Sequence, residues 1–194
     1  MTRDYAAGVQ VRRVSRRLRQ ACFAILVALG ALSCPTICPA DDDALEEFKA
    51  VYLFNFAKLT VWPTSAAADL LTICFIGAPG VRDLIARDVT GKLIGARHVA
   101  VRSLGPSQRA DDCSIVYIDA AAVGASSSAA GAPANALTVS DAHDFAYHGG
   151  MIELFFKDNR LRFIINLDNA RLAGLKMSSS LLALASKVEQ LGSP

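Results

Sequence analysis

The sequence lacks the short motifs that mark the common enzyme classes. It contains no G-x-S-x-G nucleophile elbow, no G-x-x-x-x-G-K-S/T phosphate loop, no G-x-G-x-x-G dinucleotide motif and no H-E-x-x-H zinc motif. Each of these motifs supplies a nucleophile, a phosphate cradle or a pair of metal ligands at a fixed spacing. Their absence argues against the corresponding hydrolases and cofactor enzymes, and it predicts a protein that is not an enzyme.

An excess of positive charge is also lacking outside the first 40 residues. The whole chain has 20 Lys and Arg and 18 Asp and Glu residues, which gives a formal net charge of +2. Residues 1–40 hold six Arg and one Asp, so residues 41–194 keep 14 basic and 17 acidic residues, a net of about −3. Nucleic-acid binding depends on Lys and Arg that neutralise phosphates, so this balance predicts no nucleic-acid partner.

The first 40 residues have the pattern of a bacterial secretory signal peptide. Five Arg between residues 12 and 19 precede a 12-residue apolar run from Ala21 to Leu32, and Ala40 stands before three Asp. The run is too short to cross a bilayer, which needs about 20 residues. We expect cleavage after Ala40, export, and a soluble mature chain of 154 residues. An uncleaved anchor and a lipoprotein cut at Cys34 are the alternatives.

Cysteine is scarce in the expected mature chain. Cys22, Cys34 and Cys38 fall in the leader, which leaves Cys74 and Cys113. Two cysteines in an oxidising compartment predict one disulfide, with two separate buried thiols as the alternative. A bond between them would close a loop of about 40 residues, to which the chain-entropy model assigns roughly 3 to 4 kcal/mol.

Residues 41–194 have a length typical of a single domain, which we expect to begin with a long helix. Within "DALEEFKAVYLFNFAKLTVWP", residues 43–63, apolar side chains recur at steps of three and four and predict a wide apolar face formed by Leu45, Phe48, Tyr52, Phe56 and Leu59. Acidic residues at its start and Lys58 near its end match the helix dipole. Pro63 is expected to stop the helix.

Short β-rich runs then alternate with helical or loop segments. "LLTICFIG" is an apolar strand typical of a parallel sheet, "PGVRDLIARDV" a helix, and "RHVAVRSL", "CSIVYID" and "LTVSD" are further strands. "MIELFFKDNRLRFIINL" predicts two strands joined by a "KDN" turn, and two short helices follow in "DNARLAGL" and "SSSLLALASKVEQL". This order predicts an α/β fold of three layers: a mostly parallel sheet, helices on both faces, and an antiparallel hairpin near the C-terminus.

Two polar groups near residues 140–150 have both a chemical and a structural interpretation. His148-Gly149-Gly150 could form part of an oxyanion loop, but without a nucleophile the turn into the hairpin is favoured. Asp141, His143, Asp144 and His148 could suggest a metal site. The two histidines are five apart and lie in a loop, so a solvated turn is favoured. No metal ligand and no catalytic residue is predicted.

One group of basic and apolar residues suits recognition of another protein. Arg and Met are enriched at protein interfaces, and here they stand beside apolar and small side chains. The candidate partner-binding residues are Trp62, Arg160, Arg162, Arg171, Leu172, Leu175, Lys176, Met177 and Leu181. Helix-core packing is the alternative for the leucines, and packing in the core or at its rim is the alternative for Trp62.

Several blocks occur in the order found in one protein family. They are "KAVYLFNFAKLTVWP", "ICFIG", the Cys of "DDCSIVYID", "LTVSD", "FAYHGGMIEL" and "NRLRFIINLDNARLAGLKMSSSLLALA". The aromatic helix ending in Trp-Pro, together with the "GGMI", "NRLRFIINL", "AGL" and "SS" series, is the specific part. Over residues 44–188 the chain resembles the YfiR/HmsC-like family.

The resemblance implies a non-enzymatic regulator of the Gram-negative periplasm without a cofactor. Such a protein binds the periplasmic sensor region of an inner-membrane diguanylate cyclase and inhibits it, which lowers cyclic di-GMP and biofilm formation. An OmpA-like outer-membrane lipoprotein can sequester the inhibitor, and the inhibitor forms homodimers. By position, Cys74 and Cys113 match the family's cysteine pair. A second pair near the Gly-Gly segment, present in some relatives, is absent here.

Two other functions remain open at the level of the sequence. In the first, the domain is a periplasmic sensor of small molecules, with a ligand crevice at the carboxyl edge of the sheet near Gly77-Ala78-Pro79-Gly80. In the second, more remote, it is a hydrolase with an unrecognised site that includes Ser140, Asp141 and His148.

Overall fold

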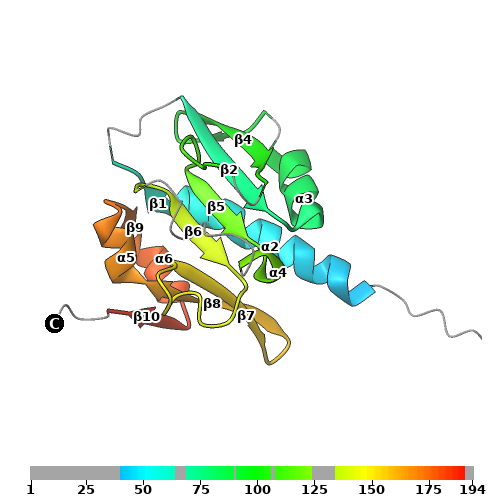
Figure 1. Ribbon diagram of the computed structural model, residues 1–194, viewed down its shortest axis with the longest axis vertical. Coiled ribbons are helices and arrows are strands. Elements are labelled where there is room, and N and C mark those ends of the chain that lie inside the picture. The colour runs from blue at the N-terminus through cyan, green and yellow to red at the C-terminus, as the bar shows by residue number, and fades with distance from the viewer. Residues whose placement is uncertain (1–39, 64–68, 90, 106–107, 124–133, 191–194) are drawn as a thin grey trace, which may run out of the picture. The chain divides into compact units, whose positions relative to one another are not determined.

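The computed structural model describes residues 40–63, 69–89, 91–105, 108–123 and 134–190 (Figure 1). The predicted signal peptide lies outside these residues except for Ala40, where the first described helix begins. Part of the Ala- and Ser-rich segment before residue 134 also lies outside them. No helix of the described ranges is long and apolar enough to cross a membrane.

An eight-stranded sheet forms the centre of the described fold. Its order is β10-β8-β7-β6-β5-β2-β4-β3, and every neighbouring pair is parallel except β3 with β4 and β7 with β8. The strands are β2 (Leu70–Ile76), β3 (Leu93–Ile94), β4 (Arg97–Ser103), β5 (Ile115–Ile118), β6 (Leu137–Ser140), β7 (Ile152–Lys157), β8 (Arg160–Asn166) and β10 (Lys187–Glu189). The predicted mostly parallel sheet with an added antiparallel hairpin is confirmed.

The turn of the hairpin has the chemistry that the sequence predicts. Lys157 pairs with Arg160, which leaves a two-residue loop of Asp158 and Asn159. Both loop residues have positive φ, +53° and +58°. Asp and Asn tolerate this conformation, and the resulting turn follows the right-handed twist of the strands.

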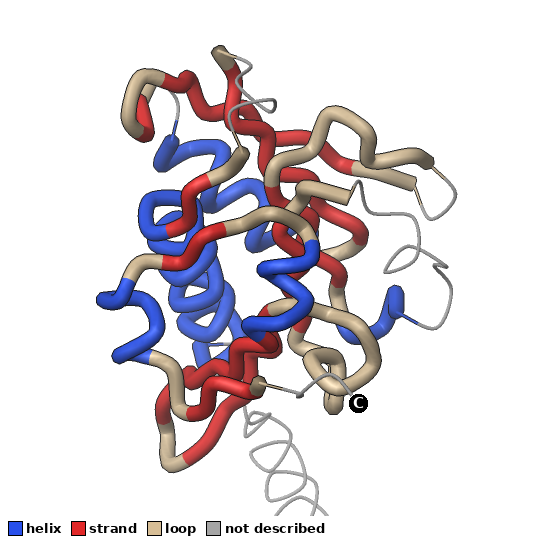
Figure 2. Tube along the Cα trace, turned by 90° about the vertical axis from the view of Figure 1, so that its left-hand side faces the viewer, coloured by secondary structure: helices blue, strands red, loops and turns tan. Residues whose placement is uncertain are grey.

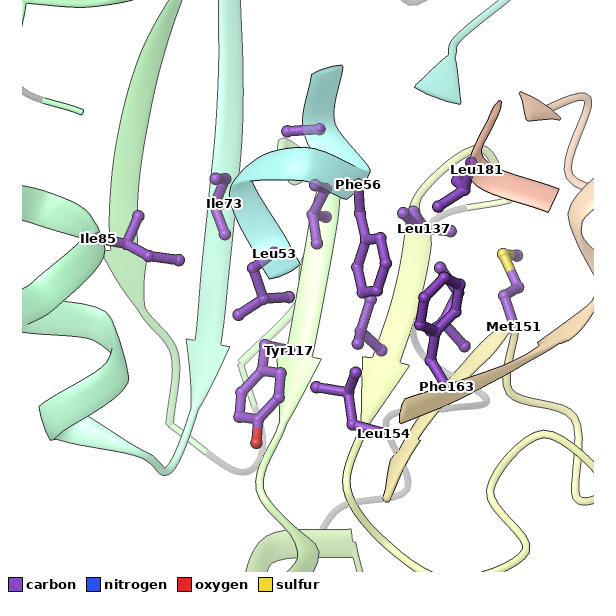
Figure 3. Close-up of a cluster of buried hydrophobic side chains, with 14 of the residues drawn as sticks. Leu53, Phe56, Ile73, Ile85, Tyr117, Leu137, Met151, Leu154, Phe163 and Leu181 are labelled. Atoms are coloured by element: carbon purple, nitrogen blue, oxygen red, sulfur yellow. The ribbon is translucent and has the colours of Figure 1, made fainter. Parts of the chain in front are cut away.

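Four helices pack on one face of the sheet: α2 (Ala40–Leu59), α3 (Pro79–Val89), α5 (Leu167–Leu172) and α6 (Ser179–Leu184). The core between them and the strands is aromatic and aliphatic (Figure 3). Phe56 of α2 meets Phe163 of β8 edge to face, with ring centroids 5.1 Å apart. Ser178 caps α6 by accepting a hydrogen bond from the Leu181 N–H at 3.1 Å.

The buried face of α2 differs from the predicted one. Ala50, Leu53, Phe56 and Ala57 are buried, whereas the side chain of Phe48 is 53% exposed. Alanines at 50 and 57 let the helix backbone approach the sheet closely. Because α2 is apolar on several sides, its periodicity does not decide which side faces the core.

Two chain segments depart from their predicted secondary structure. The first helix ends at Leu59, four residues before Pro63, because β1 (Thr60–Val61) pairs antiparallel with β9 (Lys176–Met177). The last predicted helix is also shorter: α6 ends at Leu184, and β10 adds a parallel edge strand to β8. In both places a pairing with a distant strand overrides local helical preference.

The second face of the sheet carries the short helix α4 (Ala120–Val123) and loops (Figure 2). Cys74 of β2 and Cys113, just before β5, form the predicted disulfide there, with Cα atoms 5.8 Å apart. Both cysteines are buried, and the apolar side chains around them include Leu104 and Phe145. Among the described residues, α4 is the only helix on this face.

Candidate partner-binding surface

The predicted partner-binding residues lie at two places separated by the length of β8. Arg160 and Arg162 lie where β8 begins, beside the hairpin turn. The others lie where β8 has ended, on α5, β9 and α6, or beside β1. We treat these two places as separate surfaces.

The first of them, the α5–β9 surface, consists of Val61, Arg171, Leu172 and Lys176. Leu172 is 86% exposed and Val61 61% exposed, the highest values among the large apolar side chains of α5 and of the β1–β9 ribbon. Lys176 pairs with Val61 across the ribbon, and Arg171 lies 3.5 Å from Asp168. Met177, next to Lys176, is half-buried against the core.

Leu175 and Leu181 do not belong to any surface. Their side chains are 2% and 1% exposed and pack in the core beneath α5 and α6. A partner cannot touch them in this conformation, so their assignment as contact residues is corrected to core packing. The alternative left open for these leucines by the sequence is the one that the structure shows.

Trp62 forms one wall of a cavity at the amino ends of β2 and β5. Its Nε1–H donates to the Ser114 carbonyl oxygen at 3.1 Å, and the Arg97 guanidinium lies 5.6 Å from the ring centroid. Arg97 also donates to the Leu70 carbonyl oxygen and to Ser114 Oγ. Burial lowers the pKa of Arg97. The cavity has a volume of about 570 Å³, and Thr72 also lines it.

The second surface is a groove of about 370 Å³ between α2, the β7–β8 hairpin and the end of α6, which we call the hairpin groove. Its apolar walls are Phe48, Tyr52 and Leu184, and its basic rim is Arg160 and Arg162. Phe48 and Leu184 are 53% and 69% exposed. The sequence analysis did not predict that these two residues are exposed, because each lies in an apolar pattern typical of a buried helix.

The crevice expected near Gly77-Ala78-Pro79-Gly80 is filled by side chains. A Cβ at Gly80 would overlap the carboxylate of Glu46, which reaches it from α2, and a Cβ at Gly77 would lie 2.7 Å from the Cβ of Asp119. The carboxyl ends of β2 and β5 are therefore closed by protein groups.

Polar contacts hold the middle of α2 over this edge of the sheet. Lys49 Nζ lies 2.6 Å from Asp141 Oδ2, and Asp141 Oδ1 accepts the Ala120 N–H at 2.9 Å. Beneath them the Tyr117 hydroxyl is buried without a hydrogen-bond partner among the described residues. Burial, reinforced by Asp141 and Asp119, raises the pKa of Tyr117, so this hydroxyl stays neutral.

The residues between β6 and β7 form a tight structural turn. Gly149 has a φ of +98°, and a Cβ at Gly150 would overlap the Phe145 ring and lie 2.7 Å from the Phe145 carbonyl oxygen. Buried Glu153 accepts the N–H groups of Asp144 and Ala146, each at 3.2 Å. Within the described ranges no three His, Cys, Asp or Glu residues gather closely enough to hold a metal ion.

Comparisons with known proteins give a family match and a similar solved structure. A family model described as YfiR/HmsC-like matches residues 46–186. A solved structure of a conserved domain protein from Vibrio cholerae O1 biovar El Tor strain N16961 is similar with a TM-score of 0.46 and 12% identity, over 74% of this chain and 60% of that one. The chain thus spans about 60% of that protein's length. Comparison with curated proteins found no match.

Proposed function

Because the chain belongs to the YfiR/HmsC-like family, we propose that it binds the periplasmic sensor region of an inner-membrane diguanylate cyclase and inhibits the enzyme. The family is periplasmic and regulatory rather than catalytic, and its members regulate membrane diguanylate cyclases. The family match carries this proposal, because it extends from the first turns of α2 to the residue before β10. The Cys74–Cys113 disulfide supports export to an oxidising compartment, where such bonds persist.

Inhibition by binding requires a difference in affinity between two conformations of the cyclase. To hold an evenly balanced cyclase 99% inactive, the chain must prefer the inactive form by about 2.7 kcal/mol, which is RT ln 99. A few well-packed contacts supply this, because one central interface residue is often worth about 2 kcal/mol or more. The regulator therefore needs no chemistry beyond an exposed surface.

We propose that the α5–β9 surface is one of the contacts with the cyclase. Exposed Leu172 and Val61 supply apolar area, and Lys176 has no ion-pair partner among the described residues. We also propose that an OmpA-like lipoprotein sequesters the inhibitor and that the chain forms homodimers, as the family resemblance implies.

Substitutions on this surface test the function. Leu172→Asp and Lys176→Glu should raise intracellular cyclic di-GMP in a strain that expresses only the variant, while Leu93→Asp, at an exposed apolar residue of edge strand β3, should not. Equal abundance of the three proteins in periplasmic extracts is the control. Cyclic di-GMP at the level of the unaltered chain in all three strains would contradict the proposal.

A second function, binding of a small organic molecule, is supported by the cavity beside Trp62. Its lining combines an indole face, the Arg97 guanidinium and the polar side chains of Thr72 and Ser114. It lies at the amino ends of the strands rather than at the carboxyl edge expected from the sequence. Thermal-shift screening against periplasmic extracts should give a ligand that stabilises the unaltered chain and not Trp62→Ala, and no stabilising fraction would remove this function.

A further inference from the structure

The outward side of α2 presents an exposed stripe that no described element covers. Phe48, Val51, Asn55 and Lys58 follow one another at steps of three and four residues, and all four are exposed. The side chains of Phe48 and Val51 are each 53% exposed. Phe48 and Val51 form the apolar half of this stripe, and side chains at this spacing form the ridge by which one helix packs against another.

A groove lies on each side of this stripe. On one side is the hairpin groove, with Phe48 and Tyr52 in its wall. On the other side a smaller groove of about 90 Å³ separates α2 from α3, and Val51 and Phe54 line it. A ridge between two grooves complements the ridges and grooves of a second helix.

Basic residues border both grooves, and most of them have no carboxylate partner among the described residues. Arg160 makes no ion pair with the described residues, and Arg162 Nε is buried without an acceptor, its guanidinium reaching only Asp158 at 3.6 Å. Across the stripe, Lys58 and Lys92 approach the Phe54 ring at 5.6 Å and 5.7 Å.

The carboxylate that lines the smaller groove does not balance the charge of the lysines beside it. Asp88 lines the smaller groove, but its ion pair is with Arg87. Within the described ranges neither Lys58 nor Lys92 has an ion-pair partner, so an acidic ligand would complement the charge of this surface.

We propose that the hairpin groove and the outward stripe of α2 bind an acidic amphipathic helix of a protein partner. Apolar residues of that helix pack on Phe48, Val51 and Leu184, as in other helix-in-groove complexes. Its carboxylates accept hydrogen bonds from Arg160 and Arg162, whose planar guanidinium groups suit bidentate pairing. This inference rests on the proposed function, because it takes the partner to be the periplasmic region of the cyclase.

Two other occupants fit the charges less well. An anionic membrane would be repelled by exposed Asp43 and Glu47, which stand at the start of the same helix. A second copy in a two-fold dimer would bring the same patch against itself, and with it two sets of the same cations. An acidic protein helix carries its carboxylates at separate positions, so they can face the basic residues of the grooves and lie away from Asp43 and Glu47, which a continuous anionic surface cannot do.

The test measures binding of the full exported chain to the purified periplasmic region of its cyclase. That cyclase is the one whose own deletion abolishes the rise in cyclic di-GMP that follows deletion of this gene. Arg160→Glu and Val51→Asp should each weaken binding by about tenfold or more, as expected for central interface residues. Leu93→Asp and Arg109→Glu are the controls, because they replace an exposed apolar residue with Asp and an exposed Arg with Glu elsewhere on the chain, and they should stay within about twofold.

A charge-swap experiment identifies the acidic helix itself. Replacing one carboxylate of the partner with Lys should weaken binding to the unaltered chain and restore binding to Arg160→Glu, which loss of folding could not produce. Raising the NaCl concentration should weaken the unaltered complex more than the Arg160→Glu complex.

Each other outcome overturns the inference. If Arg160→Glu and Val51→Asp bind as the controls do, the groove is not the docking site, although the proposed function stands. If the unaltered chain does not bind the cyclase region at all, both fall. If these variants instead abolish binding to phosphatidylglycerol vesicles, or convert a dimer to a monomer in sedimentation velocity, the occupant is a membrane or a second copy.

Discussion

Removal of the Cys74–Cys113 disulfide should lower the free energy of unfolding by about 4 kcal/mol. The bond joins residues 39 apart in sequence. For a closed loop of about 40 residues, the chain-entropy model gives a loss of about 13 cal/mol/K in the unfolded state, which is about 4 kcal/mol at 25 °C. This is a large share of the free energy of unfolding of a typical domain, which is about 5 to 15 kcal/mol.

The substitution used to break the bond matters, because both cysteines are buried on the second face of the sheet. Cys74→Ala with Cys113→Ala removes the bond and leaves no polar group behind. Cys74→Ser with Cys113→Ser also buries two hydroxyls among apolar neighbours, which adds about 1 to 3 kcal/mol for each one left unpaired.

Thermal and urea denaturation of the exported protein, each with and without reductant, measure the effect. The alanine pair should lower the melting temperature by about 8 to 16 °C, at 2 to 4 °C per kcal/mol for a domain of this size. The serine pair should lower it further. Adding reductant should shift the unaltered chain and leave both variants where they are. Equal unfolding midpoints for the oxidised chain and the alanine pair would refute the assignment of a stabilising disulfide.

Two further substitutions probe the elements that position the surfaces. Gly150→Ala should lower the melting temperature, because its Cβ would overlap Phe145, whereas Gly105→Ala, where the nearest atom is 3.7 Å away, should not; equal melting curves would contradict this. Lys49→Met should destabilise the chain by about 1 to 3 kcal/mol in urea unfolding, because it leaves the largely buried Asp141 without its ion-pair partner. An unchanged midpoint would show that solvent replaces the lysine.

Local signals in the sequence were sufficient for several elements. The β7–β8 hairpin follows from alternating β-rich runs around Asp158-Asn159, and α3 follows from Pro79 and the buried steps to Val89. The disulfide follows from the count of cysteines and the expected compartment. Each of these predictions depends on residues near in sequence or on composition alone.

The predictions that failed depend on partners distant in sequence. β10 forms because the free edge of β8 offers backbone hydrogen-bonding groups to Val188. The sequence of residues 178–191 does not indicate that such an edge lies nearby. In the same way, the sequence does not show that Leu175 and Leu181 lie beneath their helices while Leu172 lies outside. Which side of an apolar helix is buried is decided by packing, and the two candidate surfaces follow from that decision.

Intracellular cyclic di-GMP in a strain that lacks this gene tests the central claim most directly. The strain is complemented either with the whole chain or with a version that lacks residues 1–40 and stays in the cytoplasm. We expect cyclic di-GMP to rise on deletion and to return to its original level only with the exported chain. An unchanged level on deletion, or equal rescue by the version that is not exported, would contradict a periplasmic inhibitor of a diguanylate cyclase.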